Sequence, residues 1–307
     1  MNKKLVAADI GGSKSRIRLL DTDGTVLSEA VGTGVADAED HTAPLPALET
    51  LISEVSHGGS AGAVAINLGG KNTGQVLTTF RKFFPNVPVK IFRESEGTAA
   101  FALGKKYGAP IILMAGTGAI AVGQWKGNFV TAGGWGINIG DAGSGYDIGL
   151  QAVRMSLAAL DNTEPLSPLA KCICGCEKPL ATTRDPSVFK DNRDQVREKI
   201  APFDRQHIAS FTKTVAEFAE RGDRSALEIF EYAGKNLAEL VINTGKKLGD
   251  AQKSVVVTGG LIHTKKFWGE SFEAVLKDFR IQYVCDGLLY GTYLIAKELY
   301  EQENKRA

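Results

Sequence analysis

The sequence is poor in the features that mark membrane, nucleic-acid-binding and disulfide-rich proteins. No apolar run comes near the ~20 residues that a helix needs to cross a bilayer. The 36 basic and 35 acidic residues leave a formal net charge of +1, so no strong field draws the chain to nucleic acid or to a membrane surface. Only 4 cysteines occur among 307 residues, too few for a disulfide scaffold. We therefore expect a protein with no nucleic acid and no membrane among its partners.

The beginning of the chain also lacks the features of a secretion signal. The short apolar stretch in MNKKLVAADIGG contains the charged residue Asp9, and no small-residue cleavage site follows it. Because cysteine is scarce and no such signal is visible, we expect a cytoplasmic location.

The overall composition is typical of a soluble globular protein, with 43% hydrophobic and 23% charged residues. The length suits one large domain or two ordinary ones. Three strands open the chain as an antiparallel meander, and strands then alternate with helices, which favours a mostly parallel sheet with crossover helices. The predicted strands are 3–9, 15–21, 25–31, 62–67, 87–93 and 110–116, and the predicted helices are 45–56 and 95–106.

Helices dominate the rest of the chain. The apolar spacing predicts helices at 144–160, 195–222, 224–248 and 286–302, with strands at 253–260 and 281–285. The stretch 161–194 is rich in Pro, Asp, Asn and Cys, so we expect an irregular insertion or a mobile loop there.

Two glycine turns recur at the ends of predicted strands. Asp9 ends the first strand and leads into Gly11-Gly12-Ser13-Lys14, and Gly116-Thr117-Gly118 interrupts the apolar stretch MAGTGAIAVG. The backbone N–H groups of such turns can bind phosphate oxygens, and the Asp9 carboxylate can hold a Mg²⁺ ion. Taken singly, the turns can also be a tight hairpin and a β-bulge. Their recurrence indicates two related halves that face a common cleft.

Two further glycine-rich stretches follow. Residues 133–149, GGWGINIGDAGSGYDIG, suit no regular element. We expect a loop that ends at Ser144 near a helix N-terminus and places Asp141 over the cleft; a purely structural loop is the alternative. Gly259-Gly260 ends the buried strand of VVVTGG, where a flat ring can lie on the bare backbone, unless the pair is only a helix-entry turn.

In this order the four stretches resemble the actin-like ATPase and sugar kinase superfamily. The first turn is similar to its phosphate-1 motif, the second to phosphate-2, and VVVTGG to the adenosine motif. Residues 133–149 resemble the signature that N-acetylglucosamine and glucosamine kinases share with the BadF/BadG/BcrA/BcrD ATPase family. The resemblance implies an α/β fold of two ribonuclease H-like lobes with an interlobe ATP cleft. The lobes would be residues 1–112 with the closing helix 287–307, and residues 113–286.

The resemblance also implies the activity, which is ATP-dependent phosphorylation of a hydroxyl of an amino sugar or related hexose, with Mg²⁺. The partners would be a small-molecule sugar and, in a homodimer, a second copy of the chain. The implied contacts are Asp9 for Mg²⁺; Gly11, Gly12, Ser13, Lys14, Gly116, Thr117 and Gly118 for the ATP phosphates; Gly259 and Gly260 for adenosine; and Gly134, Trp135 and Asp141 for the sugar.

Two positions depart from that family. Its catalytic base is an Asp at the start of the helix after the interlobe strand, and here Glu94 occupies that position with a carboxylate that can accept a proton equally well. Glu96 is a nearby rival, and both acids also suit a helix N-terminus for electrostatic reasons alone. Residues 31–37 lack the Asn that sugar kinases of this type often carry, which weakens an assignment to N-acetylglucosamine itself.

Three cysteines, Cys172, Cys174 and Cys176, are close enough to share a zinc ion or an iron–sulfur cluster, although we favour reduced thiols on a loop. The stretch is similar to the zinc site of ROK-type sugar kinases but is shorter and lacks its partner histidine. Two alternatives to a kinase stay open. One is an activator-type ATPase that couples hydrolysis to electron transfer in a partner enzyme, and the other is a non-catalytic protein that binds ATP or sugar.

Overall fold

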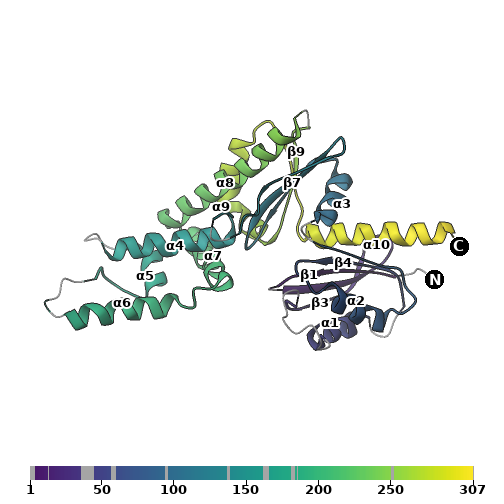
Figure 1. Cartoon of the computed structure of the whole chain (residues 1–307). Helices are drawn as coiled ribbons and strands as arrows, with labels where there is room; N and C mark the ends of the chain where they lie inside the picture. The colour runs from purple at the N-terminus through teal and green to yellow at the C-terminus, as the bar shows by residue number, and fades with distance from the viewer. Residues whose placement is uncertain are drawn as a thin grey trace. The chain divides into compact units, whose positions relative to one another are not determined.

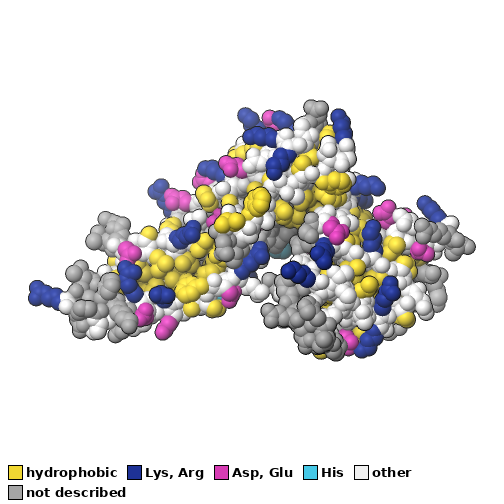
Figure 2. Space-filling model, in the orientation of Figure 1, with side chains coloured by type: hydrophobic (Ala, Val, Ile, Leu, Met, Phe, Trp, Pro, Cys, Tyr) yellow, Lys and Arg dark blue, Asp and Glu magenta, His cyan; other side chains and the backbone are white. Residues whose placement is uncertain are grey.

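The chain divides into two compact units, one formed by Met1–Ala109 with Asp286–Ala307 and the other by Pro110–Cys285. Figure 1 shows the elements of both in this computed structural model. In the view of Figure 2, lysines and arginines lie interspersed with acidic side chains. The structure describes residues 4–12, 14–35, 45–56, 60–93, 96–136, 139–161, 166–180, 184, 186–249 and 252–306.

The first unit contains a five-stranded mixed sheet in the order β3-β2-β1-β4-β5. Its first three strands form the predicted antiparallel meander, and the last two run parallel to β1. The strands are β1 (Lys4–Ile10), β2 (Lys14–Leu20), β3 (Val26–Thr33), β4 (Ala61–Leu68) and β5 (Val89–Arg93). The helices are α1 (Pro46–Ser56), α2 (Thr73–Phe83), α3 (Thr98–Tyr107) and α10 (Gly287–Arg306).

The two faces of this sheet carry separate cores, because side chains alternate along a strand. Val6 and Ala8 of β1 pack in the core that contains α1 and α2. Leu5 and Ala7 pack instead with residues of α3 and α10. Figure 1 shows α10 and α1 on opposite sides of this sheet. Asp9 has the parity of Leu5 and Ala7, so it lies on the α10 face at the carboxyl end of β1.

The second unit repeats this topology. Its sheet has the order β10-β9-β6-β7-β8, which is the order of the first sheet read from the other edge. The first three strands are again antiparallel, and the last two run parallel to β6. The strands are β6 (Ile111–Ala115), β7 (Ala119–Trp125), β8 (Asn128–Gly133), β9 (Ser254–Thr258) and β10 (Arg280–Tyr283). The duplication confirms that the chain consists of two related halves, each opening with a strand, a glycine turn and an antiparallel strand.

Helices make up most of the second unit. They enclose an apolar core in which Phe230, Trp268 and Phe272 are among the largest fully buried side chains. Within the described part of the chain, no helix combines the length and apolarity needed to cross a bilayer. The helices are α4 (Gly145–Leu160), α5 (Pro168–Cys174), α6 (Pro186–Ile200), α7 (Arg205–Glu220), α8 (Arg224–Leu248), the 3₁₀ helix η2 (Gly260–Thr264) and α9 (Lys265–Val275).

Three predictions of local structure were wrong. The stretch 161–194 is not an irregular insertion, because it contains α5 and the beginning of α6. The single helix expected at 195–222 is two helices, since Pro202, which has no N–H to donate, lies in the break between α6 and α7. Helix α2 was missed between two predicted strands, although Val76 and Phe80 give it a buried face.

The sequence does contain the signals that form α5. The hydroxyl of Ser167 accepts a hydrogen bond from the N–H of Ala170 at 3.1 Å, as a helix cap does. Pro168 begins the helix, where its missing N–H costs nothing. Gly175 ends it with a φ of +67°, in the left-handed region that glycine adopts easily.

Candidate functional site

The first candidate phosphate turn follows β1 in the first unit. The N–H of Gly11 donates a hydrogen bond to the carbonyl of Lys14 at 3.0 Å, which closes the turn. Gly34, just after β3, packs on the turn so closely that a Cβ atom there would lie 2.1 Å from the carbonyl oxygen of Gly12. Ser13, the remaining predicted phosphate contact, lies outside the described residues. Sequence reasoning missed Gly34, because nothing in the stretch 31–37 shows that it meets the first turn.

Asp9 is held between two neighbouring strands. Asn67 pairs with it in the register of β1 and β4 and donates from Nδ2 to its Oδ1 at 2.8 Å. Burial raises the pKa of Asp9, and the hydrogen bond from Asn67 and the charge of Arg16 oppose that rise. A partly buried carboxylate at the carboxyl end of a strand fits Mg²⁺, since hard cations prefer oxygen ligands and would offset the cost of removing the charge from water. Sequence reasoning did not identify Asn67.

A cluster of ion pairs lies beside Asp9 on the same sheet face. Arg16 and Arg18 of β2 both contact Asp286, the residue before α10, and both contact Glu29 of β3. Burial alone would raise the pKa of Asp286, but the hydrogen bonds from the two arginines outweigh burial and lower it. The cluster therefore fastens the start of α10 to the meander that carries the first turn.

The predicted catalytic base stays a prediction. Glu94 lies outside the described residues. Glu96, its rival, is exposed in the connection between β5 and α3.

The second candidate phosphate turn joins β6 to β7 in the second unit. The N–H of Gly116 donates to the carbonyl of Gly118 at 2.9 Å. The first turn of α4 covers the same loop, because the N–H groups of Gly145 and Tyr146 donate to the carbonyls of Gly116 and Thr117 at 2.8 and 3.1 Å. The turn is thus fixed by backbone hydrogen bonds on both of its sides.

Asp141 is buried against this second turn. It is 4% exposed and adopts a φ of +59°. Its Oδ1 accepts a hydrogen bond from the N–H of Ala119 at 3.4 Å, and its Oδ2 lies 3.6 Å from Nη2 of Arg205. The carboxylate therefore contacts the second candidate phosphate turn, and its expected contact with a sugar remains a prediction.

Gly259 and Gly260 follow β9 and lie beside the same turn. Gly259 has a φ of +107°, and a Cβ atom on it would lie 2.2 Å from the carbonyl oxygen of Ala115. The N atom of Gly260 lies 3.8 Å from the position of a Cβ on Gly116. The second unit therefore brings the phosphate-2 and adenosine motifs together at the carboxyl ends of two adjacent parallel strands, where α/β sheets bind ligands.

The signature loop runs from the end of β8 to α4, as predicted. Gly134 has a φ of +71°, and its N–H donates to the carbonyl of Ala119 at 3.0 Å. Trp135 next to it is 75% exposed, so a large flat side chain is available to a ligand. Ser144 ends the loop, and its hydroxyl accepts a hydrogen bond from the N–H of Asp147 as the cap of α4.

Two of the three clustered cysteines, Cys172 and Cys174, lie on helix α5 and not on a loop, whereas Cys176 follows the helix in irregular structure. Cys172 is exposed, whereas Cys174 is buried. Burial, together with the nearby Cys176, raises the pKa of the Cys174 thiol to about 11. Among the residues that the structure describes, no three or more His, Cys, Asp or Glu side chains gather as the ligands of a metal ion would.

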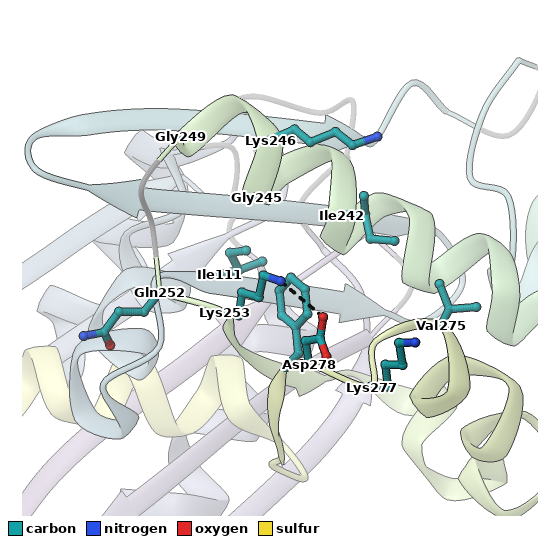
Figure 3. Close-up of a pocket in the computed structure, with 11 residues that line it drawn as sticks. Ile111, Ile242, Gly245, Lys246, Gly249, Gln252, Lys253, Val275, Lys277 and Asp278 are labelled. Carbon is teal, nitrogen blue, oxygen red and sulfur yellow. Dashed lines mark hydrogen bonds and ion pairs between the residues drawn. The ribbon is translucent and has the colours of Figure 1, made fainter.

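A cavity of about 350 Å³ lies at the other end of the second sheet (Figure 3). Ile111, Ile242 and Phe279 line it, and an ion pair between Lys253 and Asp278 crosses its rim at 3.3 Å. It adjoins the amino ends of β6 and β9. Because ligands of α/β sheets bind at the carboxyl ends, the glycine turns and not this cavity form the candidate active site.

Comparison with known proteins identifies relatives along nearly the whole chain. An N-acetylmuramic acid/N-acetylglucosamine kinase from Clostridium acetobutylicum is 27% identical over 288 residues, which cover 89% of this chain and 90% of that protein. An N-acetyl-D-glucosamine kinase from Dictyostelium discoideum is 31% identical over 166 residues, 53% of this chain and 49% of that protein.

Solved structures show the fold. A glucokinase of the ROK family from Streptomyces griseus, in complex with glucose and AMPPNP, superposes with a TM-score of 0.57 at 19% identity, covering 96% of this chain and 99% of that one. The activator of 2-hydroxyisocaproyl-CoA dehydratase from Clostridium difficile, with bound ADPNP, has a TM-score of 0.52 at 14% identity, with 99% and 98% covered. The α/β fold is thus the actin-like ATPase fold of sugar kinases, as predicted. Residues 8–284 match one family throughout, and the chain belongs to that family, the BadF/BadG/BcrA/BcrD ATPases.

Proposed function

We propose that this protein is an ATP-dependent kinase that phosphorylates a hydroxyl group of an amino sugar or a related hexose. The observation that carries the proposal is the assembly, in one unit, of the turn at Gly116–Gly118, the buried Asp141 and the glycine pair after β9. The two curated relatives, both named as kinases of N-acetylated amino sugars, support this acceptor class.

On the donor side, the two glycine turns bind phosphate oxygens of ATP through backbone N–H groups, and the pair Gly259-Gly260 receives the adenosine. Asp9 would hold Mg²⁺, with Asn67 fixing the direction of the carboxylate. The ion, when bound, would neutralise charge on the phosphates, so catalysis here is mainly positioning and electrostatic stabilisation.

On the acceptor side, Glu94 accepts the proton of the sugar hydroxyl as its oxygen attacks the γ-phosphorus. The bond from that phosphorus to the bridging oxygen breaks, and ADP leaves. Gly134 and Trp135 supply a face for the sugar ring. We also propose that Asp141 contacts the sugar.

An ADP-release screen over hexoses, amino sugars and N-acetylated sugars, N-acetylmuramic acid included, tests the function. We expect at least one sugar to stimulate ADP release. Glu94→Gln should lower that turnover about 10²-fold or more, while the turnover of Glu96→Gln stays near that of the parent.

If ATP binds but no sugar is phosphorylated, the protein is a non-catalytic binder. A brown, iron-containing protein after anaerobic purification would instead support the activator-type ATPase. Light scattering and cell fractionation test the expected homodimer and cytoplasmic location.

A further inference from the structure

We propose that Arg205 is a further residue of the phosphate site, and that its guanidinium binds the phosphate oxygens held at the turn Gly116–Gly118. No motif in the sequence identifies this arginine. The inference rests on the proposed kinase function for the identity of its ligand.

The position of Arg205 is the first part of the argument. It is the first residue of α7, and its Nη2 atom lies 3.6 Å from Oδ2 of Asp141. A Cβ atom on Gly118 would lie only 2.6 Å from the same Nη2 atom. The guanidinium therefore lies directly against the second turn, in space that any side chain at residue 118 would fill.

The electrostatics are the second part. A positive charge at the N-terminal end of a helix is unfavourable, because the helix dipole is positive there. The separation of 3.6 Å from Asp141 also exceeds the roughly 2.7–2.9 Å of a charge-assisted hydrogen bond. The Arg205 side chain is 49% exposed, so its contact with Asp141 leaves N–H donors directed to solvent. An anion at the turn would satisfy them.

The chemistry of arginine completes the argument. The planar guanidinium matches phosphate in a two-bond arrangement and keeps its charge throughout the reaction. It therefore stabilises the transferring phosphoryl group without exchanging a proton. Asp141 contacts both Ala119 of the turn and Arg205, so this one buried carboxylate fixes the cation relative to the backbone donors.

Three variants test the proposal: Arg205→Ala, Arg205→Lys and the control Arg224→Ala. Arg224 begins α8, is 91% exposed and pairs only with Glu228 among described residues. We expect Arg205→Ala to lower kcat/KM for ATP by about 10²- to 10³-fold and to leave KM for the sugar unchanged. Arg205→Lys should recover part of the loss, because lysine keeps the charge without the two-bond geometry. Arg224→Ala should match the parent protein.

Calorimetry with ATP and with adenosine separates the possible failures. We expect Arg205→Ala to weaken ATP binding and to leave adenosine binding unchanged. Equal weakening of both ligands, or a parent-like kcat/KM with parent-like ATP affinity, would overturn the proposal. If the parent protein phosphorylates no sugar, the proposed function fails, and the difference between ATP and adenosine still decides whether Arg205 binds phosphate.

Discussion

Gly34 and Gly12 touch through their backbones: a methyl group on Gly34 would lie 2.1 Å from the carbonyl oxygen of Gly12 and 2.5 Å from that of Gly11. Real Cβ atoms do not approach an oxygen so closely, so Gly34→Ala must displace the first candidate phosphate turn. We expect kcat/KM for ATP to fall at least about tenfold and stability to fall by about 1–3 kcal/mol. Steady-state kinetics with varied ATP and urea denaturation measure the two effects.

Gly74→Ala is the matched control for that change. Gly74 lies in α2, and a Cβ atom on it meets nothing within 4 Å. Alanine loses less conformational freedom than glycine in a helix, so the control should raise stability by about 0.5–1 kcal/mol and leave the kinetics unchanged. Equal turnover in the two variants would show that the position of the first turn does not matter for catalysis.

Asp9→Asn should lower kinase activity and raise the stability of the fold. Burial raises the pKa of the Asp9 carboxyl in the folded protein above its ordinary 3.8. The stabilisation that this shift contributes is therefore fully present below pH 3.8 and is lost as the pH rises through the folded-state pKa. An uncharged amide avoids that loss. Asp9→Asn should therefore be more stable than the parent at pH 7, while its kinase turnover falls about 10²-fold or more.

Urea denaturation at pH 7 and near pH 3.5 checks the origin of this gain. The advantage of Asp9→Asn should shrink at the lower pH, where the parent carboxyl is mostly protonated in both the folded and the unfolded state. An advantage that is equal at both values, or absent at pH 7, contradicts the assigned role of burial.

The parts of the site that follow a strand directly could be predicted from the sequence, because a glycine turn after an apolar run is a local pattern. The turn at Gly116–Gly118 is of this kind, and the cap Ser144 could be predicted from a second local pattern, a serine directly before a helix. The residues that support those turns could not be predicted. Asn67 reaches Asp9 from a neighbouring strand, and Arg205 reaches the second turn from the start of a helix, so only the fold brings each pair together.

In the fold, too, local sequence patterns predict some features and only tertiary contacts determine the others. The repeated order of strands could be anticipated from two similar strand–turn–strand units in the chain. The break between α6 and α7 and the whole of α5 could not be, because a polar, cysteine-bearing segment resembles a loop until the helices it packs against are known. Ser167 and Gly175 are local signals for the two ends of that helix. They are only two residues, however, and the polar, cysteine-containing composition of the segment around them favours a loop.

Asp286→Asn should lower stability at neutral pH and lower it by less in acid. Burial would raise the pKa of Asp286, but its hydrogen bonds from Arg18 and Arg16 prevail and lower it. Such a carboxylate stabilises the fold above its unfolded pKa of 3.8, and the stabilisation is lost as the pH falls through the lower folded-state value. Urea midpoints of parent and variant at pH 7 and pH 3 measure the difference.

Asp278→Asn provides the comparison for Asp286→Asn. Asp278 pairs with Lys253 at 3.3 Å, and both side chains are more than half exposed. Exposed pairs of this kind contribute about 0–1 kcal/mol, so this variant should change little at either pH. If it destabilises the protein as much as Asp286→Asn does, the cluster that fastens α10 has no special role.

The four cysteines should differ sharply in reactivity. Cys172 and Cys285 are exposed, whereas burial raises the pKa of the Cys174 thiol to about 11 and keeps it protonated at ordinary pH. Ellman's reagent at pH 8 should therefore label Cys172 and Cys285 rapidly and Cys174 only after unfolding in urea. Cys172→Ser with Cys285→Ser should abolish the fast phase. If a chelator such as EDTA instead releases protected thiols in the folded protein, those thiols hold a metal ion, and a reduced, metal-free cluster is the wrong description.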